Sequence, residues 1–258
     1  MSDPAIAALN SLLRRTTVED HGEALKLASA AIKAAKGNRD DLVTAQHTRV
    51  VALLKLDRFD DALRAIVEGG TALEKLCLLE KSYALYKTGE LEAAQALLQN
   101  AGDGRGIKHV AAQVAYRAEK FEKAAKIYKG LASSGEDSQH YGEENDLRIN
   151  LSATHAQLEW QGQGGAVPDA EKQPGREDLE AFETAYNAAC GCISRGDFAK
   201  AAVLLKRSRD LCEATEDLDE EEKKTELVPI IVQQAYVFTR LGKLDEAASL
   251  YNSIDLSE

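Results

Sequence analysis

The sequence is poor in the residues that cross-link, stiffen or interrupt a chain. Its 258 residues include four prolines, four cysteines, one tryptophan and one methionine. So few prolines leave room for long helices, because proline lacks an amide hydrogen and clashes with the preceding helical turn. The cysteines have the spacing of neither a disulfide framework nor a zinc site, so we expect reduced thiols in helical cores: Cys77, Cys190, Cys192 and Cys212.

Long apolar runs and a basic, apolar leader are also missing. No stretch of about 18 apolar residues could span a bilayer, so we expect no membrane span. The first residues, Met1-Ser2-Asp3-Pro4, do not begin a secretory signal. Together with the expected reduced thiols, these absences predict a cytoplasmic protein.

Positive charge is scarce as well. Lysine and arginine number 32 against 43 aspartates and glutamates, which gives a net charge of −11 and an isoelectric point near 5.1. Phosphate binding needs a clustered positive field, so nucleic-acid binding is not expected as the main function. A local basic stripe stays open.

Catalytic signals are absent too. The five histidines have neither metal-ligand nor triad spacing, and no phosphate-binding glycine motif precedes a helix: His21, His47, His109, His140 and His155. The sequence therefore predicts a non-enzymatic protein with no catalytic, cofactor-binding or metal-binding residues.

What the chain does have is a recurring phrase: a turn residue, an apolar residue, two spacers and an alanine. Its copies end at Ala62, Ala94, Ala124, Ala201 and Ala247, with a looser first copy at Ala24. Repetition near a period of about 34 residues is the signature of tetratricopeptide repeats (TPR), each a pair of helices. We predict an all-α, TPR-like superhelical solenoid of about six helix-turn-helix repeats, one of them degenerate. Such arrays usually bind other proteins.

The spacing of the copies predicts one solenoid over residues 1–258. Four regular repeats fill 1–132, with first helices at 5–13, 42–56, 73–87 and 107–118. Residues 133–177 form a half-repeat, because the helix at 146–160 is followed by a stretch rich in Gly and Pro that favours a flexible loop at 161–177. Two further repeats occupy 178–258, with an acidic insert at 213–224. That insert is either a solvated loop or helix extension, or a docking surface for a basic partner.

The phrase has a mechanical explanation. Alanine is expected where the second helix crosses the first most closely, opposite a small residue of that first helix, as at Ser82, Ala112, Ala189 and Ala235. The aromatic or leucine of the phrase would fill the gap toward the next pair.

The first helices of a TPR array line its concave face, which predicts a partner-binding groove. Its apolar floor with tyrosines suits a bound helix or extended peptide: His47, Val51, Leu54, Lys55, Leu76, Leu79, Tyr83, Tyr86, Lys87, His109, Gln113, Tyr116 and Arg117. Lys55, Lys87, Arg117 and Arg240 share one repeat position. They are either a basic rail for an acidic partner segment or cations that offset helix dipoles.

Several stretches are more specific than a generic TPR requires. They include Asn150-Leu151-Ser152-Ala153 in the half-repeat, Tyr186-Asn187-Ala188-Ala189-Cys190 in the next helix, and the acidic insert. In this order the chain resembles the family of N-terminal TPR regions from the 72-kDa subunit of the eukaryotic signal recognition particle.

The resemblance implies a function. In that family the TPR region holds the C-terminal segment of the 68-kDa subunit, and the pair supports co-translational targeting to the endoplasmic reticulum. It implies a cytoplasmic location, with endoplasmic reticulum association and nucleolar assembly. RNA contact lies in a basic segment beyond the TPRs that is not found here, so we expect a fragment that reaches the particle RNA only indirectly. The alternative is a TPR adaptor or co-chaperone of another assembly. Asn150 and Asn187 stand where carboxylate-clamp TPRs have asparagine, but the basic partners of such a clamp are missing.

Overall fold

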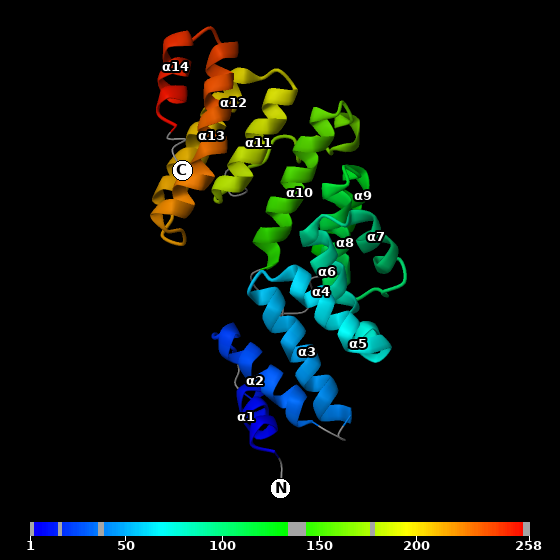
Figure 1. Cartoon of the computed structure of the whole chain (residues 1–258). Helices are drawn as coiled ribbons and strands as arrows, with labels where there is room; N and C mark the ends of the chain where they lie inside the picture. The colour runs from blue at the N-terminus through cyan, green and yellow to red at the C-terminus, as the bar shows by residue number, and fades with distance from the viewer. Residues whose placement is uncertain (1–2, 15–16, 36–38, 134–142, 176–178, 255–258) are drawn as a thin grey trace. The chain divides into compact units, whose positions relative to one another are not determined.

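The computed structural model describes residues 3–14, 17–35, 39–133, 143–175 and 179–254, and these are helical with short connections. The predicted all-α fold of TPR-like helix pairs is confirmed. The described helices run in order along the chain (Figure 1), and none is long and apolar enough to cross a membrane. By contacts the chain divides into two compact units, residues 1–119 and 120–258, each described separately below.

The first unit contains three complete helix pairs and the first helix of a fourth. The helices are α1 (Pro4–Leu13), α2 (His21–Ala34), α3 (Arg39–Lys55), α4 (Phe59–Glu68), α5 (Gly70–Leu76), α6 (Leu78–Thr88), α7 (Leu91–Leu98) and α8 (Arg105–Arg117). Consecutive helices pack together, and α6 also contacts α4 and α8.

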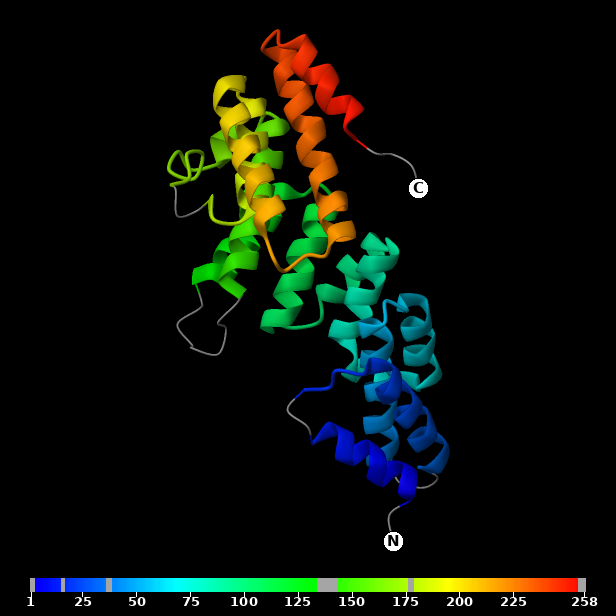
Figure 2. The same cartoon turned by 90° about the vertical axis from the view of Figure 1, so that its left-hand side faces the viewer.

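The second unit continues the alternation with one irregularity. Its elements are α9 (Phe121–Ser133), α10 (Glu143–Trp160), the 3₁₀ turn η1 (Gly164–Ala166), α11 (Phe182–Ser194), α12 (Phe198–Ala214), α13 (Glu220–Arg240) and α14 (Leu244–Asn252). The long α13 lies beside both α12 and α14 (Figure 2). After α10 the described chain has only η1 where a second helix would be due, as the Gly-rich sequence predicts.

The alanines of the recurring phrase are buried. Ala62, Ala94, Ala124 and Ala201 are completely buried and Ala247 is 4% exposed. The small residues predicted opposite the last four alanines are also completely buried: Ser82, Ala112, Ala189 and Ala235. Ser82 satisfies its hydroxyl by donating a hydrogen bond to the Leu78 carbonyl, 2.7 Å away. Close approach of two helices needs small side chains on both, so these positions, rather than the larger apolar ones, define the repeat.

Six of the turns that follow a first helix share one conformation. One residue per turn is left-handed, and its φ lies between 55° and 89°: Asp57, Gly89, Glu119, Gly162, Gly196 and Gly242. After Asp57 and after each of the four glycines the next amide donates to the carbonyl five residues earlier, at 2.8–2.9 Å, as in Gln163 to Leu158. This pattern is a Schellman-type helix end. The half-repeat therefore keeps the complete turn and loses only the helix that should follow.

The helix predicted at 73–87 is interrupted. Cys77 leaves the helical conformation, with φ −94° and ψ 36°, and separates α5 from α6. No Gly or Pro stands there to announce the break. Cys77 is completely buried in the core with Leu53, Ile66 and Leu73, so burial of its side chain accompanies the departure from helical backbone.

The acidic insert is helical at its two ends, residues 213–214 and 220–224, and not helical between them. Asp219 caps α13 by accepting hydrogen bonds from the Glu221 and Glu222 amides, both at 2.9 Å, and the Glu222 carboxylate accepts from the Asp219 amide in return. Carboxylates in the first turn also favour the positive end of the helix dipole. The helix-extension interpretation holds for residues 220–224, whereas docking of a basic partner stays untested.

The loop after α10 is anchored over its described part, residues 161–175. Val167 is buried, and Arg195 donates to the Lys172 carbonyl at 3.1 Å. Arg195 also pairs with the buried carboxylate of Glu159. These contacts hold the described part of the loop in place, whereas its Gly and Pro content predicts a flexible loop. Residues 134–142 and 176–178 of the predicted loops, with His140, lie outside the described residues.

Candidate protein-binding face of the first unit

The thirteen residues predicted to line the groove come from α3, the α5–α6 segment and α8, and none of them is buried. Val51 is 37% exposed and Leu76 is 51% exposed, whereas Val50, Ala52 and Leu53 next to Val51 are buried. One side of α3 thus supplies the core and another side faces solvent. Exposed apolar side chains at these positions are available for a partner.

Aromatic side chains connect α4 to α6. The Phe59 and Tyr83 rings meet edge to face with centroids 6.1 Å apart, and Tyr83 and Tyr86 are 6.3 Å apart. We call Phe59, Tyr83 and Tyr86 the aromatic ladder. Both tyrosines also pack against the buried cluster of Ala94, Val110 and Val114. The core therefore supports the two tyrosine rings of the ladder.

Cations stand over the rings of this ladder. The Lys87 ammonium lies 5.2 Å from the centre of the Phe59 ring, and the Arg117 guanidinium lies 5.6 Å from that of Tyr86. Arg117 also donates to the Tyr86 carbonyl at 2.8 Å. In the second unit Arg240 lies over the Phe198 ring at 4.5 Å. Three of the four predicted rail cations therefore make cation–π contacts within the chain, which gives them a structural role whatever they bind.

His47 is tied to a neighbouring repeat. Its Nε2 lies 2.8 Å from the Glu80 carboxylate of α6. The hydrogen bond to Glu80 raises the pKa of His47 above its ordinary 6.5, against the opposing effect of burial. The sequence predicts His47 as a groove residue, but it does not predict that Glu80 bonds to His47 or that Phe59 lies beneath Lys87. Phe59 could have been found, because it is the aromatic of a phrase copy.

No described cysteine is prepared for nucleophilic chemistry. Burial raises the pKa of Cys77 to about 12 and that of Cys190 to about 11, and it also raises the pKa values of Cys192 and Cys212. A reactive cysteine needs the opposite shift. All four thiols are free, and Cys77, Cys192 and Cys212 lie in the core as predicted, whereas Cys190 is only partly buried.

A hollow of about 840 Å³ lies beside the turns that follow α3 and α6. Its lining mixes acidic and basic side chains with one ring, among them Asp57, Asp60, Arg64, Lys87 and Phe59. Of the predicted groove residues it includes Lys87 alone. Opposite charges side by side offer no net field to select a charged ligand, so we assign the hollow no function.

Asn187, one of the two asparagines at clamp positions, makes hydrogen bonds within the second unit. Asn187 of α11 donates to the Ile149 carbonyl at 3.3 Å and to the Ser152 hydroxyl at 3.1 Å, both on α10. These bonds hold two first helices together. They use the amide that a carboxylate clamp would need.

Paired helices with small buried residues in a repeating pattern define a helical-repeat protein. The comparisons with known proteins are more specific. The chain belongs to the family described as "Putative TPR-like repeat" (SRP_TPR_like), whose model matches residues 17–157.

Curated relatives agree with this assignment. The chain is 34% identical to the signal recognition particle subunit SRP72 of Canis lupus familiaris and to that of Homo sapiens, over 225 residues in each case, which is 84% of this chain and 32% of each relative. It is 30% identical to SRP72 of Caenorhabditis elegans over 252 residues, 95% of this chain and 37% of that protein. The chain thus spans about a third of the length of these relatives.

A solved structure supports the fold alone. The apo form of the quorum sensor NprR from B. thuringiensis matches with a TM-score of 0.53 at 13% identity, over 97% of this chain and 85% of that one.

Proposed function

We propose that the chain is a non-enzymatic protein-binding scaffold of the signal recognition particle. Its exposed face on α3, α5, α6 and α8 would hold the C-terminal segment of the 68-kDa subunit and so support co-translational targeting to the endoplasmic reticulum. Its site of action would be the cytoplasm, with nucleolar assembly. Particle RNA would be reached indirectly or through a region outside this sequence.

One observation carries the proposal: thirteen exposed or half-buried residues, spaced by the repeat, lie on the first helices of a chain similar to SRP72. Leucine, valine and tyrosine in such a set offer apolar area and rigid rings to a helix or extended peptide at low entropic cost. Lys55, Lys87 and Arg117 would add attraction for acidic residues beside the apolar anchors, even while two of them rest on rings.

Binding of a peptide from the 68-kDa subunit's C-terminal segment, measured by calorimetry with the whole chain, tests the proposal. Val51→Asp combined with Leu76→Asp should weaken binding at least about tenfold, because each change puts a charge among apolar anchors. Val67→Asp is the matched control, since Val67 is 64% exposed on α4, outside the predicted groove. No binding at micromolar concentration, or equal losses in the groove variant and the control, would overturn the proposal.

Charge is tested separately by the Lys87→Glu, Arg117→Glu double variant. We expect weaker binding and a smaller dependence of affinity on salt. Circular dichroism must confirm its folding, because Arg117 holds the Tyr86 carbonyl. Unchanged affinity in a folded variant would remove the basic rail from the proposal and leave the apolar face standing.

The second candidate is a TPR adaptor or co-chaperone of another assembly. Its usual device, a clamp for a peptide's terminal carboxylate, would need an Asn187 amide that is free to bind it, and that amide is bonded to α10. Binding of an acidic peptide with a free C-terminus, lost on amidation of that terminus, would favour this candidate instead.

A further inference from the structure

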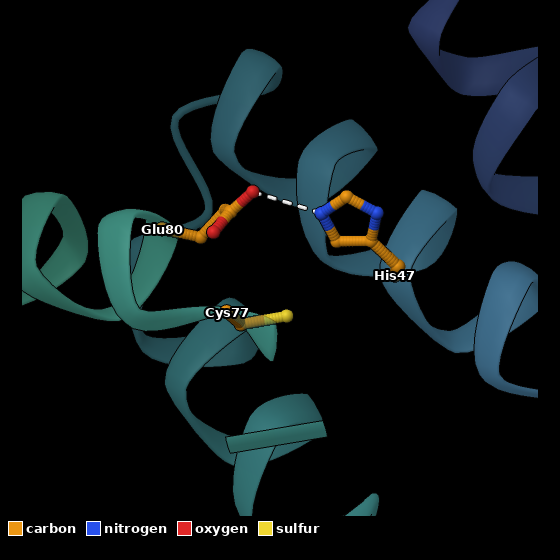
Figure 3. A group of neighbouring side chains, drawn as sticks. All are labelled: His47, Cys77 and Glu80. Atoms are coloured by element: carbon orange, nitrogen blue, oxygen red, sulfur yellow. Dashed lines mark hydrogen bonds and ion pairs between the residues drawn. The ribbon is translucent and has the colours of Figure 1, made fainter. Parts of the chain in front are cut away.

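Three side chains with metal-binding atoms meet in the first unit at the edge of the exposed face. They are His47 of α3, Cys77 between α5 and α6, and Glu80 in the first turn of α6 (Figure 3). One donor atom from each, a ring nitrogen, the sulfur and a carboxylate oxygen, lies within 4.8 Å of the other two. The imidazole and the carboxylate point at each other, and the sulfur lies beneath their hydrogen bond in this view.

The backbone explains why these residues converge. Cys77 and Glu80 are three residues apart at the start of α6, so they project from the same side of that helix. The third group comes from the preceding repeat, because α3 packs against both α5 and α6. The set therefore joins two consecutive repeats rather than neighbouring positions of one helix.

We propose that His47, Cys77 and Glu80 bind one Zn²⁺ ion, with a solvent water as the fourth ligand. A ring nitrogen, a thiolate and a carboxylate are the ligands that zinc prefers. A thiolate and a carboxylate together balance the two positive charges of the ion, and the imidazole binds as the neutral form. Binding releases the thiol proton of Cys77 to solvent.

Access and reach are compatible with such a site. The side chains of His47 and Glu80 are 37% and 17% exposed, so an ion and its water can enter from solvent, whereas Cys77 closes the buried side. Donor atoms around tetrahedral zinc stand roughly 3.3–3.8 Å apart. Because the three donor atoms lie within 4.8 Å of one another, the trio needs a contraction of at most about 1.5 Å and a slight opening of the His47–Glu80 pair.

Cobalt is the probe, because Co²⁺ occupies zinc sites and its thiolate complexes absorb light. Titration of the whole chain with Co²⁺ should produce a thiolate-to-cobalt band in the near ultraviolet and tetrahedral bands in the visible, saturating at one equivalent. Zn²⁺ should abolish these bands. Cys77→Ser should remove the near-ultraviolet band, and His47→Gln should weaken cobalt binding at least about tenfold. Cys212→Ser, which alters another buried thiol, is the matched control.

The outcomes separate cleanly. No thiolate band at millimolar Co²⁺, or a band that persists in Cys77→Ser, would overturn the proposal and leave a histidine–carboxylate bridge beside a core thiol. If Cys77→Ser does not fold, the partly exposed His47→Gln decides, since unaltered cobalt binding in that variant also refutes the site. The measurement uses no peptide, so its result does not depend on the scaffold function.

Discussion

Replacing Glu119 by glycine should stabilise the first unit. Glu119 is left-handed, with φ 58°, at a place where four other turns have glycine. A side chain in this conformation costs roughly 1–2 kcal/mol, because Cβ crowds the following carbonyl. Glycine removes that cost but loses about 0.4–1 kcal/mol through the greater freedom of the unfolded chain. The expected net gain in the free energy of unfolding is about 0.5–1 kcal/mol.

The other turns of this unit provide a graded series. Asp57→Gly should gain less, since aspartate tolerates the left-handed region better than glutamate does. Gly89→Ala, at φ 89°, should lose about 1 kcal/mol. Urea unfolding followed by circular dichroism measures all three. Glu119→Ala keeps Cβ while removing the carboxylate, so it should change stability by only a few tenths of a kcal/mol. A Glu119→Gly protein no more stable than Glu119→Ala would refute this explanation of the turns.

Two further predictions concern the second unit. Ala124→Leu should cost about 1–3 kcal/mol of unfolding free energy, because Ala124 is completely buried at a helix crossing; urea unfolding tests it, and an equal loss in the exposed Ala199→Leu control would contradict it. His155 should make stability depend on pH: burial lowers its pKa below 6.5, despite Glu171 at 3.0 Å. The unfolded chain therefore takes up this proton first as pH falls, so the stability contributed by neutral His155 is complete above pH 6.5 and lost below it. Relative to wild type, His155→Gln should fare better at pH 5 than at pH 7.5, and a constant difference would contradict the assignment.

The parts of the fold that follow from short-range pattern could be predicted from the sequence. The alanines and their small counterparts obey steric rules that operate wherever two helices cross, so Ala94 and Ala112 were identifiable without coordinates. The loss of a helix after α10 followed from Gly164 and Gly165 in the same way. The capping box at Asp219 and Glu222 was also legible, as Asp-x-x-Glu before a helix, and would have placed the start of α13 correctly.

The rest depends on how repeats pack against one another. His47 and Glu80 are 33 residues apart, and only the packing of α3 on α6 brings them together. The interruption at Cys77 lies among good helix formers, so no local propensity announces it. The contact of Lys87 with the Phe59 ring likewise requires the register of two repeats. For the thirteen groove residues, the position within each helix could be predicted from the repeat, whereas their exposure comes from the structure.

The half-repeat has a practical consequence for engineering. After α10 the chain retains the left-handed Gly162 and the closing hydrogen bond from Gln163, which are the demanding parts of a helix pair. Val167 stands three residues after Gly164 and is buried, where a regular copy would have its alanine. A designed helix that replaces residues 164–175, with alanine at position 167, would thus enter on a turn already formed. The turn after α10 thus offers an insertion point for a new binding element.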